Sequence, residues 1–270
     1  MSDPLSPTEI AVLSGGPANV LEGSWPDRHI LNVGRLELHS FRLDESRAAS
    51  LVYVGGGYLK MVHDKEGVEI AAWLNSLGID AHVVVHRLPG APANDGAVNP
   101  FDVALRDGLV CLDHVAGMTP ELPLFHVGLS SGGHLAGAMA CQPHAMKLAG
   151  ALIGYAPINA NHRDHKAPAG KPDYPPVEKQ AFYDAWPIGI AGEPHGMPPC
   201  PVFLAYALHD KAVPIEHALN FIRSARDLGR DVDAHIFGTA PHGFALRDLN
   251  GTQDAWPELA KRWFDRQLEN

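Results

Sequence analysis

Hydrophobic and polar positions along the chain follow the pattern of strands separated by amphipathic helices. Residues 36–43 alternate apolar and polar side chains, which is typical of a strand with one buried face. Further apolar runs of strand length lie at residues 50–54, 81–86, 124–127, 149–153, 202–206 and 234–237. The pattern therefore predicts a sheet built from strands spread over most of the chain.

Helices are predicted between successive strands. At 68–77 the apolar residues fall largely on one helical face, and Gly78 stands where a helix commonly ends. At the start of another helix, Asn99 offers a capping side chain and Pro100 suits the first helical position. The predicted helices cover residues 68–77, 99–112, 131–140, 214–229 and 256–264.

Strands that alternate with helices predict an α/β fold with a mostly parallel central sheet and helices on both of its faces. We expect one domain over residues 1–270. Residues 1–30 are expected to form an arm laid over this domain. Residues 156–199 are rich in Pro, His, Asp and Tyr and lack a sustained period. They predict an irregular lid or binding loop.

The composition excludes several classes of protein. With 21 Lys and Arg against 31 Asp and Glu, the net charge of −10 disfavours nucleic acid and anionic membrane surfaces as partners. Cys111, Cys141 and Cys200 lack CxxC spacing and predict reduced thiols. The start of the chain does not resemble a signal peptide, and no apolar run is long enough to span a membrane. We therefore expect a cytoplasmic protein.

The sharpest chemical signal is the segment Gly128-Leu129-Ser130-Ser131-Gly132, between a predicted strand and a predicted helix. It fits the pattern G-x-S-x-G, in which small neighbours let a serine stand on a tight turn with its hydroxyl exposed. The amides at the start of the helix also favour negative charge beside this serine. The alternative is a helix start whose small residues only pack on the sheet. The strand-turn-helix context favours Ser130 as a nucleophile.

A serine nucleophile needs a base and a carboxylate, and the chain offers both after later strands. Asp210 follows the strand at 202–206, at the end of the sheet where α/β proteins build their sites. Its alternative role is to cap the next helix. His242 lies between Pro241 and Gly243 after the last predicted strand, where a defined turn can hold the ring accessible for proton transfer. Its alternative is an ordinary surface histidine.

The glycine segment Gly55-Gly56-Gly57 follows the predicted strand at 50–54. Glycines let backbone amides approach a substrate oxygen closely, and together with the amide of Ser131 they would bind the oxyanion of an acyl-transfer reaction. The same glycines could form a plain flexible turn. Their occurrence with Ser130 favours an oxyanion hole.

These segments together resemble a known family. The chain resembles α/β-hydrolase esterases of the hormone-sensitive-lipase and acetyl-esterase type. It is more closely similar to small bacterial esterases labelled xylanase-associated or acetylxylan-esterase-like. The resemblance covers about residues 36–268. Its motifs are Gly55-Gly56-Gly57-Tyr58, Gly128-Leu129-Ser130-Ser131-Gly132-Gly133-His134-Leu135, Asp210-Lys211-Ala212-Val213-Pro214 and Pro241-His242-Gly243-Phe244.

The resemblance implies an α/β-hydrolase fold and a role for each matching residue. Ser130 would be the nucleophile, His242 the base and Asp210 the group that orients the base. The implied oxyanion donors are the amides of Gly56, Gly57 and Ser131.

Two segments depart from the pattern of these esterases. Val54 stands where relatives have His or Pro, at the anchor of the oxyanion loop. His86-Arg87-Leu88-Pro89-Gly90 replaces the usual Tyr-Arg-Leu-Ala-Pro and is expected to reshape the edge of the site. At these two segments the resemblance is no guide to the substrate.

Further residues are expected around the motifs. Tyr58, His209 and Trp186 are predicted to bind substrate, and His134 is expected to support the turn at Ser130 by hydrogen bonding. A metal site is the alternative use of the histidines and aspartate in the irregular segment, but their spacing matches no helical HxxxH or HExxH site. These residues are His162, Asp164, His165 and His195. No metal and no cofactor are expected.

The sequence therefore predicts a serine carboxylic-ester hydrolase that acts on a small-molecule ester through an acyl-enzyme. Short acyl esters, such as acetylated sugars, are suggested by the resemblance. An amide or peptide hydrolase with the same triad is an alternative, and a non-catalytic binding module on a hydrolase scaffold is the alternative of another class. The oligomeric state is left open, with a homodimer as one option.

Overall fold

The structure is a computed structural model that describes residues 6–94, 96–159 and 176–269. Its centre is an eight-stranded sheet in the order β1-β2-β4-β3-β5-β6-β7-β8. The pairs β1–β2 and β2–β4 are antiparallel, and the remaining neighbours are parallel. The strands are β1 (Glu9–Val12), β2 (Glu37–Phe41), β3 (Ala48–Tyr53), β4 (Ile79–Val85), β5 (Leu124–Leu129), β6 (Leu148–Gly154), β7 (Val202–Ala207) and β8 (Val232–Phe237).

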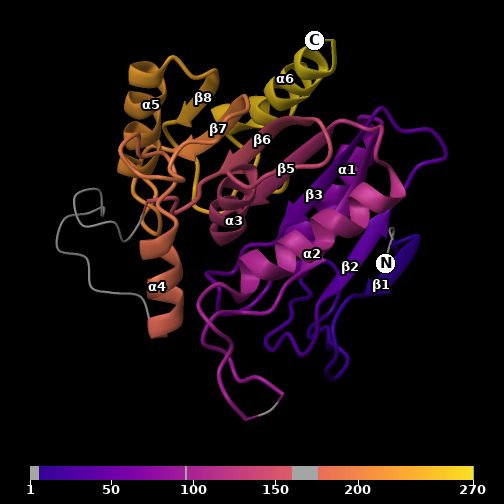
Figure 1. The fold of residues 1–270 in the computed structure, drawn as a ribbon. Helices are drawn as coiled ribbons and strands as arrows, with labels where there is room; N and C mark the ends of the chain where they lie inside the picture. The colour runs from indigo at the N-terminus through magenta and orange to yellow at the C-terminus, as the bar shows by residue number, and fades with distance from the viewer. Residues whose placement is uncertain (1–5, 95, 160–175, 270) are drawn as a thin grey trace.

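Helices cover both faces of this sheet (Figure 1). They are α1 (Glu69–Ser76), α2 (Val103–Met118), α3 (Ser131–Ala140), α4 (Val177–Ala185), α5 (Glu216–Leu228) and α6 (Trp256–Glu269). A π-helical turn, η1 (Asp64–Val68), precedes α1, and a 3-10 turn, η2 (Thr252–Ala255), precedes α6. The mostly parallel sheet with helices on both faces confirms the predicted fold class.

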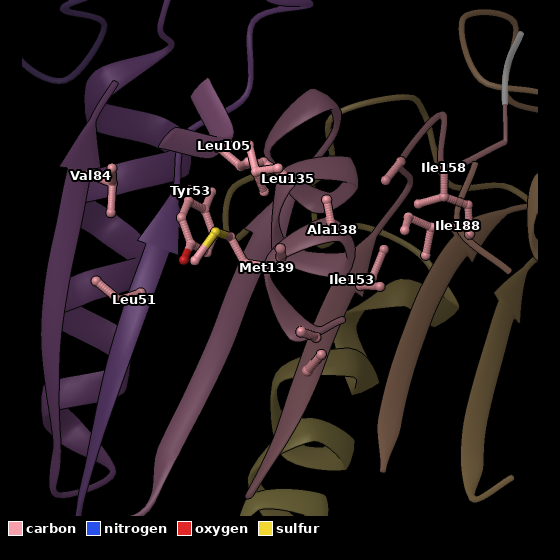
Figure 2. Packing of buried hydrophobic residues seen from close by; sticks show 14 of the residues in the cluster. Leu51, Tyr53, Val84, Leu105, Leu135, Ala138, Met139, Ile153, Ile158 and Ile188 are labelled. Atoms are coloured by element: carbon pink, nitrogen blue, oxygen red, sulfur yellow. The ribbon is translucent and has the colours of Figure 1, made fainter. Parts of the chain in front are cut away.

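Alternate residues of each central strand supply two separate hydrophobic cores. Leu51 and Tyr53 of β3 pack with residues of α2, α3, α4 and α5, whereas Val52 packs with residues of α1 and α6. Figure 2 shows part of the first core, where Tyr53, Leu135 and Met139 fill the space between α3 and the strands. Because the central strands are buried on both faces, their apolar runs do not alternate with polar residues.

Two segments expected to be irregular contain secondary structure. Residues 9–12 of the expected arm form β1, which pairs with residues 37–40 of β2 at the edge of the sheet (Figure 1). The expected irregular region 156–199 contains α4, a nine-residue helix. Short amphipathic segments such as these carry a weak periodic signal, because their packing partners lie far away in the sequence.

The helix expected from Asn99 begins at Val103 instead, with Asp102 at its N-cap position. Asn99 is buried, and its side-chain amide donates to the carbonyl of Leu88 at 3.1 Å. The amide of Asn99 also donates to the carbonyl of Ala91 at 2.8 Å. Asn99 therefore closes the loop after β4 rather than capping α2.

Two further observations concern the hydrophobicity of the helices and the cysteines. In the described residues, no helix combines the length and the hydrophobicity that crossing a bilayer requires. Cys111, Cys141 and Cys200 are free thiols, and burial raises the pKa of Cys141 and of Cys200 to about 12.

Candidate active site

Ser130 stands on a strained turn between β5 and α3. Its φ of 52° and ψ of −130° lie outside the regions that an L-residue normally occupies. The turn is held by two backbone hydrogen bonds, from the Ser130 amide to the Gly154 carbonyl and from the Gly133 amide to the Ser130 carbonyl, both 2.9 Å. A Cβ at Gly132 would overlap the carbonyl oxygen of Tyr53, so glycine is required there by close packing. This is the geometry of a nucleophile elbow.

Ser130, His242 and Asp210 meet although they lie far apart in the sequence. The Ser130 Oγ is 3.3 Å from the His242 Nε2, and the His242 Nδ1 is 2.7 Å from the Asp210 Oδ2. With Nδ1–H donated to the carboxylate, Nε2 is left to accept the proton of the Ser130 hydroxyl. The three residues therefore form a hydrogen-bonded chain from nucleophile to base to carboxylate.

Asp210 is kept ionised by its surroundings. Its side chain is inaccessible to solvent, and its Oδ1 accepts hydrogen bonds from the amides of Ala212 at 2.8 Å and Val213 at 2.9 Å. Burial alone would raise the pKa of Asp210, but the hydrogen bonds from His242 and from these two amides lower it below its ordinary value. The carboxylate therefore stays charged and holds the imidazole ring in one tautomer.

The glycine loop approaches the nucleophile from the end of β3. Gly56 and Gly57 have φ values of 133° and 69°, which glycine adopts readily. The Gly57 amide donates to the Ser131 Oγ at 2.8 Å, so this predicted oxyanion donor is engaged with the neighbouring hydroxyl. The Gly56 backbone and the amide of Ser131, at the start of α3, flank the same space as Ser130.

A cavity of about 400 Å³ opens beside these groups. Ser130, His242 and Gly56 lie on its wall, and Lys179 and Tyr183 of α4 lie on it too. Part of the segment 156–199 therefore does line the site, as expected of a binding segment. The size suits a small ligand.

The three residues predicted to bind substrate do not line this cavity in the described part of the chain. Tyr58 is buried, and its hydroxyl donates to the His134 Nδ1 at 2.9 Å. The His134 Nε2–H in turn donates to the carbonyl of Trp186 at 2.7 Å. His209 is exposed.

Tyr58 and the backbone carbonyl of Trp186 make contacts inside the structure instead, and the role of Tyr58, Trp186 and His209 in binding substrate stays a prediction. Tyr58, His134 and Trp186 connect the glycine loop to α3 and to the end of α4. Burial lowers the pKa of His134 to about 4, so this histidine is a neutral link. The prediction that His134 supports the neighbourhood of Ser130 by hydrogen bonding agrees with this position. Sequence order alone could not show that Tyr58 turns into the core, with a φ of 56°.

Metal ligands are not gathered in the described residues. No group of three or more His, Cys, Asp or Glu side chains within residues 6–94, 96–159 and 176–269 has the geometry to hold an ion. His195 stacks on Trp186 with ring centroids 4.6 Å apart. The other three residues weighed as metal ligands lie outside the described residues: His162, Asp164 and His165.

Sequence reasoning missed Glu66, which also belongs to the wall of the cavity. It lies in η1, nine residues after Gly57, where nothing in the sequence sets it apart from other helix-start acids. Only the fold brings it to Ser130 and His242.

The arrangement defines the class of protein: an α/β-hydrolase fold with a serine-histidine-aspartate triad at the carboxyl ends of its parallel strands. The chain belongs to the prolyl oligopeptidase family, which it matches over residues 103–270. The predicted membership of the α/β-hydrolase superfamily is confirmed.

Two curated proteins are similar in sequence. The acetylxylan esterase of Xylanibacter ruminicola is 25% identical over 226 residues, which are 79% of this chain and 44% of that protein. The secreted triacylglycerol lipase LIP1 of Malassezia furfur is 26% identical over 238 residues, which are 85% of this chain and 44% of that protein. The chain thus spans less than half the length of these relatives.

Solved structures share the fold. The acetyl ester-xyloside bifunctional hydrolase from Caldicellulosiruptor lactoaceticus has a TM-score of 0.68 at 21% identity, covering 98% of both chains. The carboxylesterase Cest-2923 from Lactobacillus plantarum WCFS1 also has a TM-score of 0.68 at 21% identity, covering 87% of this chain and 94% of that one.

Proposed function

We propose that the chain is a serine carboxylic-ester hydrolase. The observation that carries this proposal is the hydrogen-bonded chain from Ser130 through His242 to Asp210, which opens onto a cavity beside a glycine loop. The similarity to an acetylxylan esterase and to a triacylglycerol lipase supports ester rather than other substrates.

The reaction would run in two halves through an acyl-enzyme. In the first, the Ser130 Oγ attacks the ester carbonyl while the His242 Nε2 takes its proton, and the alcohol leaves with that proton. In the second, His242 takes a proton from water, whose oxygen attacks the acyl carbon. His242 then returns this proton to the Ser130 Oγ as the acyl–Oγ bond breaks and the acid leaves. Backbone amides of the Gly56 loop and of Ser131 would stabilise the oxyanion in both halves; Gly56 and Ser131 line the same cavity as Ser130, which supports this role.

For the substrate we propose short acyl esters of small alcohols, such as acetylated sugars. A cavity of about 400 Å³ suits an acyl group and alcohol of this size. Two relatives with acetyl ester or acetylxylan in their names give the same indication.

An amide or peptide hydrolase is the second candidate, because the family that the chain belongs to is that of prolyl oligopeptidase. The triad would be the same, and the difference lies in the leaving group, since an amine is expelled less readily than an alcohol. Comparing 4-nitrophenyl acetate with the matching 4-nitroanilide separates the two. A higher kcat/KM for the anilide would overturn the ester proposal.

Replacing the nucleophile tests the mechanism directly. Ser130→Ala is expected to lower kcat on 4-nitrophenyl acetate by about 10⁴-fold or more, because the acyl-enzyme can no longer form. The matched control is Ser76→Ala, the same change at an exposed position of α1. An active Ser130→Ala enzyme would remove the mechanism. A wild-type protein that neither hydrolyses esters nor reacts with a fluorophosphonate would indicate a binding module.

A further inference from the structure

Glu66 is a buried acid that has no role in the triad mechanism described above. It lies in the π-helical turn η1, nine residues after Gly57, and only 5% of the residue is exposed. Single π-helical turns are rare and occur often at functional sites. The side chain belongs to the wall of the cavity that holds Ser130 and His242.

The two carboxylate oxygens of Glu66 have different surroundings. Oε1 accepts a hydrogen bond from the Tyr155 hydroxyl at 3.2 Å. Oε2 is buried and has no hydrogen-bond partner among the described residues. A Cβ at Gly55 would collide with Oε2 and would come within 3.0 Å of the Ser130 Cβ. Oε2 and the nucleophile therefore lie against the same small space, which only a glycine leaves open.

Tyr155 connects Glu66 to the catalytic base. Its ring packs edge-on against the His242 imidazole, with centroids 5.2 Å apart. Tyr155 follows β6 with a φ of 35°, a strained value for a bulky residue. Its hydroxyl donates to Glu66 on one side while its ring supports His242 on the other.

The charges around Glu66 come from several elements. Burial raises the pKa of Glu66, while His242, the Tyr155 hydroxyl and Lys65 act against that rise. The Gly55 amide, which lies near the carboxylate, also lowers the pKa, although Oε2 has no hydrogen-bond partner of good geometry in the described part of the chain. Asp210 faces the same tyrosine. An unpartnered buried carboxylate oxygen lowers stability. An attraction to a positive charge that forms during the reaction would explain why such a group stands here.

Resting on the proposed ester hydrolysis, we propose that Glu66 is a positioning residue whose carboxylate stabilises the imidazolium of His242 at the moment Ser130 is deprotonated. No proton passes to Glu66. The Ser130 proton moves to the His242 Nε2 as the Oγ–carbon bond forms, and the Glu66 carboxylate keeps its charge and its hydrogen bond from Tyr155, whose ring packs on His242. Asp210 acts on the Nδ1 side of the same imidazolium.

The test is the pH profile of kcat/KM for 4-nitrophenyl acetate in Glu66→Gln, which keeps the shape of the side chain but removes its charge. Without that charge the imidazolium is less stable, so the acid limb of the profile is expected to move to lower pH. The kcat at the plateau is expected to fall about tenfold, and KM is expected to stay the same. A role limited to packing would lower thermal stability and leave the acid limb in place.

Glu69→Gln is the matched control. It makes the same chemical change three residues away and breaks an ion pair with Arg247 at 2.6 Å, outside the cavity. Its acid limb is expected to coincide with that of the wild type. Glu66→Asp retains the charge but draws it back by one methylene, so a smaller shift in the same direction is expected. If Glu66→Gln does not fold, the acid limb of Glu66→Asp shows whether the Glu66 charge acts on His242.

An acid limb that stays in place, or moves to higher pH, would overturn the role of Glu66. That result would leave the ester proposal intact, because the wild type would still hydrolyse the substrate. If the wild type does not hydrolyse esters, the rate of fluorophosphonate labelling of Ser130 against pH gives the same comparison. Failure of the proposed function is thereby distinguished from failure of the positioning role.

Discussion

At the scale of single residues, the triad is defined by hydrogen bonds that each need one particular atom. The Asp210 Oδ2 holds the His242 Nδ1–H, and two backbone amides hold the other oxygen of Asp210. Because the carboxylate is anchored from both sides, the imidazole cannot turn without breaking a short hydrogen bond. The orientation of the base therefore depends on the charge of Asp210 as much as on its position.

Asp210→Asn tests this dependence. The amide of asparagine would donate to Nδ1 and so favour the tautomer with the proton on Nε2, which cannot accept a proton from Ser130. We expect kcat to fall by about 10⁴-fold with little change in KM or in the thermal unfolding temperature. Steady-state kinetics and a thermal melt check both. A variant with near-normal kcat would show that Asp210 does not set the tautomer.

The residues that sequence reasoning could place are those whose position follows from the ends of strands. Ser130, Asp210 and His242 each follow a recognisable strand, and the parallel sheet brings those strand ends together. Tyr58 and Glu66 depend instead on the direction in which a loop residue turns. That direction depends on packing against elements that are distant in the sequence, so it cannot be predicted from the local pattern of residues.

At the scale of elements, the elbow works because β5 and α3 approach the end of β3 with no space between them. Gly132 packs against the Tyr53 carbonyl, and Ser130 is held on the β6 side by the Gly154 carbonyl. The long central strands and the helices with continuous apolar stripes were predictable from periodicity. The edge strand β1 and the short helix α4 were not, because each is stabilised mainly by contacts with other elements.

Gly132→Ala tests the packing of the elbow. The added methyl group would overlap the Tyr53 carbonyl, so either the turn or β3 must shift. We expect a loss of about 1–3 kcal/mol in the free energy of unfolding and a strong loss of fluorophosphonate labelling at Ser130. Urea unfolding and labelling rates measure the two effects.

The control for this change is Gly117→Ala in α2, where the added carbon meets nothing within 4 Å. There, alanine is expected to stabilise the helix by up to about 1 kcal/mol and to leave labelling unchanged. Equal behaviour of the two variants would contradict the packing argument.

At the scale of the whole molecule, ion pairs fasten the N-terminal segment to the body of the domain. Arg28 donates from its backbone amide at 2.8 Å and from its Nε at 3.0 Å to the Asp64 Oδ2. Arg247 similarly joins Asp27 to Glu69 with two contacts of 2.6 Å. The segment at residues 27–28 and Arg247 are thus joined to residues 64 and 69, at the two ends of the turn that carries Glu66.

The stabilisation that the Asp64–Arg28 ion pair contributes depends on pH. Burial alone would raise its pKa, but hydrogen bonds with His63 and Arg28 lower the pKa to about 2. Since the folded value lies below the unfolded one, the stabilisation is complete at neutral pH and is lost as the pH falls from about 4 towards 2.

Asp64→Asn is therefore expected to lower the free energy of unfolding by about 2 kcal/mol at pH 7 and to have a smaller effect near pH 3. Urea unfolding at the two pH values measures the difference. An equal loss at both values would mean that the charge of Asp64 contributes nothing.

The hydrogen bond between the Gly57 amide and the Ser131 Oγ affects both the ordering of the glycine loop and the strength with which its amide could bind an oxyanion. This hydrogen bond holds the glycine loop to the residue next to Ser130, which reduces the backbone entropy that the proposed reaction would have to remove from the loop. Any help that the Gly57 amide then gives to the oxyanion is reduced by the contact it must weaken. The hydrogen bond would thus exchange part of the contribution proposed for the Gly57 amide for a loop of fixed shape.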